Sequence, residues 1–161
     1  MTVIIDQKEK EPWTFPEGVK VEVADLRQGD YALKGDGTFS IERKSLKDFI
    51  GTVGTTDWAR FQREMHRMDI IGTPHKVIIV EGDFASFLFH ENEDGTIEEP
   101  EHDRVNFTPQ LACKRIAELT VYYRASVLFA ADPGSAAALA FHIFTCRQLQ
   151  IGGRIYPQDL L

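Results

Sequence analysis

The stretch GDYALKGDGTFSIERKS, residues 29–45, has the pattern of a β-hairpin with acidic side chains at its open end. A three-residue loop at 35–37, with Gly37 in the left-handed conformation, is a common hairpin form. It would place Asp30 directly opposite Glu42. One face of the hairpin would then hold only apolar side chains, namely Tyr31, Leu33, Phe39 and Ile41. A two-residue loop would shift the register and mix the two faces, so the pattern favours the three-residue loop.

In this register the side chains of Asp30 and Glu42 start roughly 5 Å apart at Cβ. Like charges directly opposite one another destabilise a hairpin, and a bound cation is the simplest compensation. Two carboxylates with a backbone carbonyl, water and a phosphate oxygen form an ordinary Mg²⁺ site. Lys44 lies two residues beyond Glu42 on the same face, where its ammonium could hold or deprotonate a water. A metal ion beside a lysine predicts phosphodiester hydrolysis.

The arrangement resembles the active-site motif of restriction-endonuclease-like nucleases and, in its specific form, the nuclease domain of the xeroderma pigmentosum group F (XPF) family. The residues that carry the likeness are Gly29-Asp30, then Glu42-Arg43-Lys44 and Asp48. Three further segments follow the order and spacing of that family: IIDQKEKEPWTF at 4–15, RFQRE at 60–64 and VIIVEG at 77–82. In the first segment Asp6 and Glu9 match the family's opening strand, whereas Lys8 stands in place of an arginine. The likeness covers about residues 3–150.

The resemblance implies an endodeoxyribonuclease that depends on Mg²⁺ or Mn²⁺ and leaves 5′-phosphate and 3′-hydroxyl ends. Its expected process is recombination, repair or phage DNA processing. The implied roles are metal binding by Asp30, Glu42, Asp6 and Arg43 (through its backbone carbonyl), catalysis by Asp30, Glu42, Lys44 and Arg43, and support by Asp48 and Glu9. Taken singly, Asp30 also fits a turn, Asp48 a helix cap and Asp6 a solvated strand end.

Two features depart from the family pattern. Its eukaryotic and archaeal members usually continue into tandem helix-hairpin-helix domains, which help to select branched DNA and to dimerise, and these 161 residues are too few to include them. The acidic stretch at 91–103 is also unlike the family's short connection. We therefore expect a free-standing member of phage or bacterial type, with one nuclease domain over residues 1–161. Branched or structured DNA is the expected partner, and a homodimer is an allowed assembly.

The rest of the chain alternates between strand and helix patterns. Strands are predicted at 2–6, 19–26, 76–82 and 125–130, and helices from Ser45 onward, at 55–71, at 108–124 and at 132–149. The second of these helices has an apolar stripe of Trp58, Phe61, Met65 and Met68. The alternation predicts an α/β fold with a central mixed β-sheet flanked by helices on both faces, which the resemblance describes as restriction-endonuclease-like. Residues 152–161 are predicted to form a loose tail.

The charge distribution decides whether DNA is an acceptable partner. The net charge of −7 argues against nucleic acid, yet the seven acidic residues at 91–103 account for all of it. Arg60, Arg63 and Arg67 share one face of a predicted helix, which predicts either a phosphate-contacting ridge or a solvated face. Two rival functions stay open: a catalytically inactive DNA-binding module, and an interaction protein whose acidic loop mimics DNA.

The sequence also bears on location. No apolar run approaches the ~20 residues that span a bilayer, and the N-terminus lacks a signal-peptide pattern. Cys113 and Cys146 are predicted to be buried thiols of a reducing compartment. We therefore expect no membrane partner and a cytoplasmic location, either near the nucleoid or in an infected bacterial host.

Overall fold

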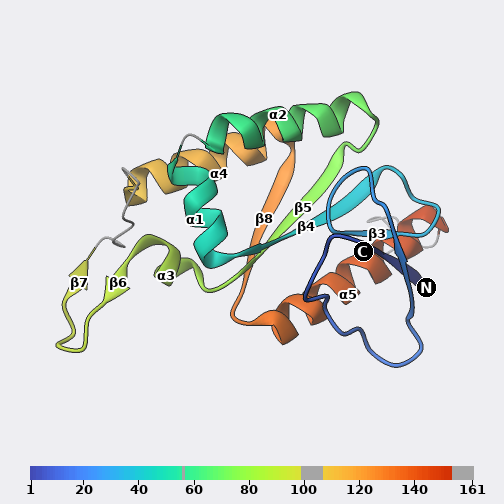
Figure 1. Cartoon of the computed structure of the whole chain (residues 1–161), viewed down its shortest axis with the longest axis horizontal. Coiled ribbons are helices and arrows are strands. Elements are labelled where there is room, and N and C mark those ends of the chain that lie inside the picture. Colours follow the sequence, from blue (N-terminus) through green and yellow to red (C-terminus); the bar gives the residue numbers. More distant parts are fainter. Residues whose placement is uncertain (56, 99–106, 154–161) are drawn as a thin grey trace, which may run out of the picture.

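A six-stranded mixed sheet forms the centre of the molecule (Figure 1). The computed structural model describes residues 1–55, 57–98 and 107–153. Across the sheet the strands are β2 (Lys20–Ala24), β1 (Thr2–Asp6), β3 (Tyr31–Leu33), β4 (Phe39–Ser45), β5 (His75–Glu81) and β8 (Ala125–Ala130). The β1–β3 and β3–β4 pairs are antiparallel and the other pairs are parallel. The predicted mixed sheet is confirmed, and the hairpin β3–β4 lies in its middle.

Helices cover both faces of the sheet, as predicted. The helices are α1 (Leu46–Gly54), α2 (Asp57–Ile70) and α4 (Pro109–Tyr123) on one face, α5 (Pro133–Ile151) on the other, and the short α3 (Phe84–Leu88) after β5 (Figure 1). Ile78 and Val80 of β5 join the core under α1, α2 and α4, whereas Val77 and Ile79 join the core under α5. The continuous apolar run of β5 is therefore explained by burial on both sides. The predicted stripe of α2 is buried at all four positions: Trp58, Phe61, Met65 and Met68.

Three helices begin at the caps that the sequence predicts. The side chains of Ser45, Thr108 and Asp132 accept hydrogen bonds from the backbone N–H groups three residues further on, at 3.1, 3.2 and 2.8 Å. Each bond satisfies a donor that the first turn of a helix leaves unpaired. Because Ser45 is also the last residue of β4, helix α1 starts where that strand ends.

The hairpin has the predicted register but a different tip. Tyr31 pairs with Ile41 as predicted, and Asp30, which precedes β3, donates its N–H to the carbonyl of Ile41 at 2.9 Å. The left-handed glycine of the connection is Gly35, with φ of 88°, and not Gly37 as predicted. The reason is a turn closed by the Asp36 N–H, which donates to the carbonyl of Leu33 at 3.0 Å. The Asp36 carboxylate also accepts a bond from Arg147 of α5 at 2.8 Å, so a distant helix contacts the tip.

Three other features differ from, or lie beyond, the predictions. The acidic stretch is not simply a loop, because β6 (His90–Glu91) and β7 (Ile97–Glu98) pair as a short antiparallel hairpin, and residues 99–103 lie outside the described residues. Cys113 and Cys146 are exposed, so their predicted burial was wrong, because each lies on the outward side of its helix. Most of the predicted tail, at 154–161, also lies outside the described residues. None of the helices that the structure describes has the length and apolar character needed to cross a membrane.

Candidate active site

Asp30, Glu42 and Lys44, here called the hairpin cluster, lie together at the middle of the sheet. Glu42 and Lys44 are the neighbours of Ile78 and Val80 in the parallel β4–β5 register, so they project from the face that α1, α2 and α4 cover. Glu42 is only 8% exposed. Glutamate is uncommon in the interior of a strand at such burial, which marks this position as one kept for its carboxylate.

The contacts inside the hairpin cluster hold the two carboxylates in place. Asp30 Oδ2 accepts a hydrogen bond of 2.7 Å from the backbone N–H of Arg43. Lys44 Nζ lies 2.8 Å from Glu42 Oε1. The same ammonium lies 5.6 Å from the ring centre of Phe61 on α2, a cation–π distance that fixes the lysine from the helix side.

Burial and charge perturb this site strongly. Burial, followed by repulsion from Glu42, raises the pKa of Asp30 to about 7. Burial also acts against the ammonium of Lys44, but attraction to Glu42 outweighs it and raises the pKa of Lys44 above its ordinary value. Lys44 is therefore a cation at neutral pH, and one cation is too few for two buried carboxylates. A further positive charge at the site would therefore balance the negative charge that Lys44 leaves unpaired.

The metal-free protein should lose stability as the pH rises from about 4 to about 7. Because the pKa of Asp30 is raised from 3.8 to about 7 in the folded state, the folded chain binds more protons than the unfolded chain between these values. The contribution of Asp30 is fully present below pH 3.8 and is lost as the pH rises through about 7. Thermal melts in EDTA across this range measure it, with Asp30→Asn as the control that should lack this component. A parent and an Asp30→Asn variant with parallel pH profiles would contradict the assignment.

The residue before Asp30 has to be a glycine. Gly29 has φ of +68°, and a Cβ added there would lie 2.9 Å from the carbonyl oxygen of Ile41 and 2.9 Å from Cβ of Ser40. Both the left-handed backbone and the close approach to β4 exclude a side chain. Gly29 thus lets the chain enter β3 close enough for Asp30 to reach the backbone of Arg43.

Asp6 lies beside the hairpin cluster but uses its carboxylate elsewhere. Its backbone N–H donates to the carbonyl of Asp30 at 2.8 Å, so the two residues are neighbours across β1 and β3. Its two carboxylate oxygens accept bonds of 2.8 Å from the N–H groups of Lys8 and Leu26. In this arrangement Asp6 ties two loops to the end of β1, which is a supporting position for the site.

Arg43 sends its side chain to the opposite face of β4 and forms an ion network there. Its guanidinium donates to both oxygens of Glu81 at 2.8 and 3.0 Å, to Glu9 at 3.1 Å and to the carbonyl of Glu11 at 2.6 Å. Trp13 donates to the same Glu81 carboxylate at 2.7 Å. The side chain that was predicted to act in catalysis thus fastens the segment after β1 to the end of β5, while its backbone N–H holds Asp30.

Glu9 and Asp48, the two predicted supporting residues, lie on this side of β4. Both line a hollow of about 320 Å³ together with Arg43, Ser45 and Glu81. Asp48 also accepts a 2.8 Å bond from the Ser45 hydroxyl at the start of α1. Their common effect is to hold the two ends of the segment that carries Glu42 and Lys44.

Glu81→Gln should lower the free energy of unfolding by about 2–4 kcal/mol, because it removes the bidentate partner of a largely buried guanidinium. The matched control is Glu22→Gln. Glu22 also bonds a cation, Lys34, at 2.8 Å, but that pair is exposed and should contribute under about 1 kcal/mol. Urea unfolding of the three proteins compares them. Equal losses in the two variants would show that the Arg43 network is no stronger than a surface pair.

Comparison with known proteins places this geometry in a family. The model of the ERCC4 domain matches residues 5–143, which include every residue of the hairpin cluster. The chain belongs to the ERCC4 domain family. This agrees with the predicted XPF-type nuclease domain. No curated protein sequence matches the chain.

Two solved structures share the fold of this ERCC4 domain. XPF from Aeropyrum pernix superposes with a TM-score of 0.62 at 22% identity, over 86% of this chain and 57% of that one. XPF from Aeropyrum pernix in complex with DNA gives a TM-score of 0.64 at 22% identity, over 96% of this chain and 67% of that one. The chain therefore spans between about half and two thirds of the length of these neighbours, and the likeness establishes the restriction-endonuclease-like fold.

The donor set of this ERCC4 domain fits a hard divalent cation that keeps several waters. Among the described residues no three His, Cys, Asp or Glu side chains are grouped so as to hold a metal by themselves. Asp30 and Glu42 supply two carboxylates, and Mg²⁺ is commonly bound by one or two carboxylates with water and substrate phosphate completing the shell. The residues present therefore suit a shared protein–substrate site better than a closed protein cage.

The three predicted DNA-contacting arginines lie together on α2. Arg60, Arg63 and Arg67 line a hollow of about 530 Å³ with one acidic residue, Glu64. Arg60 also lies 3.6 Å from Asp57, an exposed pair one turn earlier on the helix. The remaining cations face outward beside the hairpin cluster, so the geometry permits a phosphate-contacting ridge.

Glu64 is a site residue that the sequence reasoning missed. Burial, with repulsion from Glu42 next, raises its pKa, and attraction to Lys44 opposes this. Its side chain therefore faces the hairpin cluster from α2. The available signal was its spacing, since Glu64 falls four residues after Arg60 and three before Arg67 on one helix face. Glu81 belongs to the segment at 77–82 that follows the family's order, but nothing in its local sequence points to Arg43.

Proposed function

We propose that this chain is a metal-dependent endonuclease that hydrolyses phosphodiester bonds in branched or structured DNA. The observation that carries the proposal is the convergence of Asp30, Glu42 and Lys44 on one sheet face of an ERCC4 domain. Asp30 and Glu42 would hold Mg²⁺ or Mn²⁺. When bound, the cation would supply positive charge to the attacked phosphate and acidity to a coordinated water.

The side chains and backbone of the protein would supply the other functions of the site. Lys44 is held as a cation by Glu42, so it suits orienting the attacking water and neutralising charge on the phosphorane. Attack of the water on phosphorus with departure of the 3′ oxygen leaves a 5′-phosphate and a 3′-hydroxyl. The backbone N–H of Arg43 keeps one oxygen of Asp30 occupied and leaves the other for the cation. Asp6, Glu9 and Asp48 would support the site from outside it.

A panel of radiolabelled or fluorescent DNAs tests the proposal: duplex, flap, fork and four-way junction, each with Mg²⁺, with Mn²⁺ and with EDTA. Cleavage that needs the cation and favours a branched member is the expected result. Binding without cleavage under all conditions would instead favour the inactive DNA-binding module. A homodimer, a cytoplasmic location and a role in recombination, repair or phage DNA processing remain predictions from the sequence.

Arg63→Glu should weaken binding to all DNA sequences alike and reduce the slope of log affinity against log salt by about one. The physical reason is the loss of one phosphate contact and of the counterion that it releases. Fluorescence anisotropy at several salt concentrations measures the slope. The matched control is Lys114→Glu on α4, which has the same charge change outside the proposed ridge. An unchanged slope for Arg63→Glu would make the arginine face a solvated surface.

A further inference from the structure

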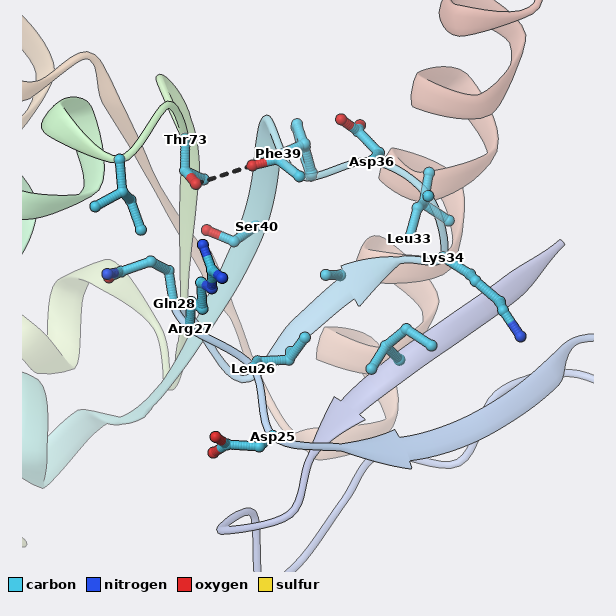
Figure 2. A pocket seen from close by; sticks show the side chains of 15 residues that line it. Asp25, Leu26, Arg27, Gln28, Leu33, Lys34, Asp36, Phe39, Ser40 and Thr73 are labelled. Carbon is cyan, nitrogen blue, oxygen red and sulfur yellow. Dashed lines mark hydrogen bonds between the residues drawn. The ribbon is translucent and has the colours of Figure 1, made fainter.

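A groove lies on the uncovered part of the sheet, here called the open-face groove. The core under α1, α2 and α4 includes sheet residues of β5 and β8, but none of β1 or β3. Ile4, Ala32 and Ser40, which lie on that same side of β1, β3 and β4, instead line a cavity of about 530 Å³ (Figure 2). The end of α2 and the loop at 25–28 form its walls. Within residues 1–55, 57–98 and 107–153 no helix packs on β1 and β3 from this side, which leaves a hollow and not a packed core.

The open-face groove lies next to the hairpin cluster along β3 and β4. Ser40 precedes Glu42 by two residues on β4, and Ala32 follows Asp30 by two residues, so all four side chains lie on one face of the hairpin. Residues two apart in a strand are separated by roughly 6.5–7 Å. A strand of substrate whose phosphate lies at the cluster would thus have its neighbouring nucleotide at the groove.

Ser40 supplies a separate sign that the groove takes a ligand. The residue is 2% exposed, and its Oγ has no hydrogen-bond partner among the residues that the structure describes. A buried hydroxyl without a partner is costly and uncommon in folded proteins. Gly29 packs closely against one side of this Ser40 side chain, and Ser40 also lines the groove.

The chemistry of the walls suits a nucleotide. On this face of the sheet the apolar lining comes from Ile4 and Ala32 on the floor and from Leu26 and Ile71 in the walls. Two of the charged lining residues are already satisfied, Lys34 by Glu22 and Asp36 by Arg147, each at 2.8 Å. Arg27 has no ion pair within the described part of the chain, and Figure 2 shows its head group on the same side as Ser40. An unpaired guanidinium beside an apolar floor matches a phosphate attached to a base.

We propose that the open-face groove binds one unpaired nucleotide of the cleaved strand, next to the scissile phosphate. The base would lie on the apolar floor, with Ser40 and Gln28 at its polar edge and Arg27 on its phosphate. A cavity of this size excludes a duplex, and a base inside a duplex has its faces stacked and its edge paired, so only an unpaired nucleotide can enter. This inference rests on the proposed nuclease function and gives that function a reason to prefer junctions over duplex.

The test uses a forked DNA with 2-aminopurine at each unpaired position near the branch, bound to the full chain carrying Glu42→Gln to prevent cleavage. We expect the fluorescence to change on binding at one position beside the branch. Adding Ser40→Ala should weaken fork binding about three- to tenfold, the loss of one hydrogen bond, and leave duplex binding unchanged. It should also keep or raise the melting temperature, because it removes an unsatisfied buried hydroxyl, whereas a purely structural serine would lower it.

Two further variants keep the test decisive. Arg27→Ala removes an exposed side chain and should weaken fork binding in the same selective way. Ser126→Ala, at an exposed position of β8, is the matched control and should change nothing. The proposal would be overturned if Ser40→Ala and Arg27→Ala both bound the fork as tightly as the parent does. It would also be overturned if they lost as much affinity for duplex as for fork. If the variants lose affinity for fork alone but the parent cleaves no DNA, the groove proposal stands and the nuclease function is rejected. If the parent cleaves DNA but the variants show no selective loss of fork affinity, the nuclease function stands and the groove proposal is rejected.

Discussion

Glu42→Gln should abolish DNA cleavage at saturating Mg²⁺ and Mn²⁺ while leaving the fold intact. A neutral amide is a poor ligand for a hard cation, so the variant should lose most of its metal affinity. In the metal-free state two effects oppose each other. The variant loses the 2.8 Å pair with Lys44 but also loses the repulsion that helps to raise the pKa of Asp30. We therefore expect its melting temperature without metal to stay close to that of the parent.

The measurements for Glu42→Gln are metal titration, thermal melts with and without Mn²⁺, and cleavage of a labelled forked DNA. In the parent, Mn²⁺ should raise the melting temperature, because it binds only the folded site. In Glu42→Gln that increase should disappear. Glu22→Gln, an exposed glutamate on the edge strand β2, is the control and should behave as the parent. A Glu42→Gln protein that cleaves as fast as the parent would end the metal-dependent proposal.

Lys44→Ala, unlike Glu42→Gln, should keep metal binding while it loses cleavage. The ammonium pairs with a carboxylate and is a cation at neutral pH, so its expected role is to stabilise charge on the reacting phosphate and water. Removal of one such group from an active site costs about 10²–10³-fold in rate. Metal affinity should hold or rise, since Glu42 would lose the competing cation.

Single-turnover cleavage and Mn²⁺ titration of Lys44→Ala separate rate from binding. Lys44→Arg keeps the positive charge and should recover part of the rate, which a general base would not allow, because arginine does not give up its proton near neutral pH. Lys20→Ala, an exposed lysine on the edge strand β2, is the control. A Lys44→Ala protein with parental rate would remove the lysine from the mechanism.

Local pattern was enough to predict much of this fold. Strand alternation, the apolar stripe of α2 and the caps at Ser45, Thr108 and Asp132 depend on residues within a few positions of one another, so they can be recognised in the chain. The hairpin register followed from the same logic, because only one register keeps its apolar side chains on one face. That register brings Asp30 close to Glu42 at the open end of the hairpin.

The backbone conformation at the tip of the hairpin could not be predicted from the local sequence. Both Gly35 and Gly37 could adopt the left-handed conformation, and the sequence nearby offers no means to choose between them. In the structure a bond from Asp36 N–H to the Leu33 carbonyl closes the turn, and Arg147 of α5, 111 positions along the chain, binds the Asp36 carboxylate. The contact exists only when α5 packs under the sheet.

The amino-acid sequence by itself determined the hairpin cluster, its register and the order of strands and helices, because these depend on spacing along the chain. The tertiary structure alone decided what surrounds the cluster. It turned the Arg43 side chain toward Glu81, used both oxygens of Asp6 on backbone N–H groups, and brought Glu64 from α2 to the site. In the described part of the chain it also left a hollow over β1 and β3 beside Ser40. The physical reason is that contacts, burial and open space are properties of segments that meet only after folding, and no local pattern specifies them.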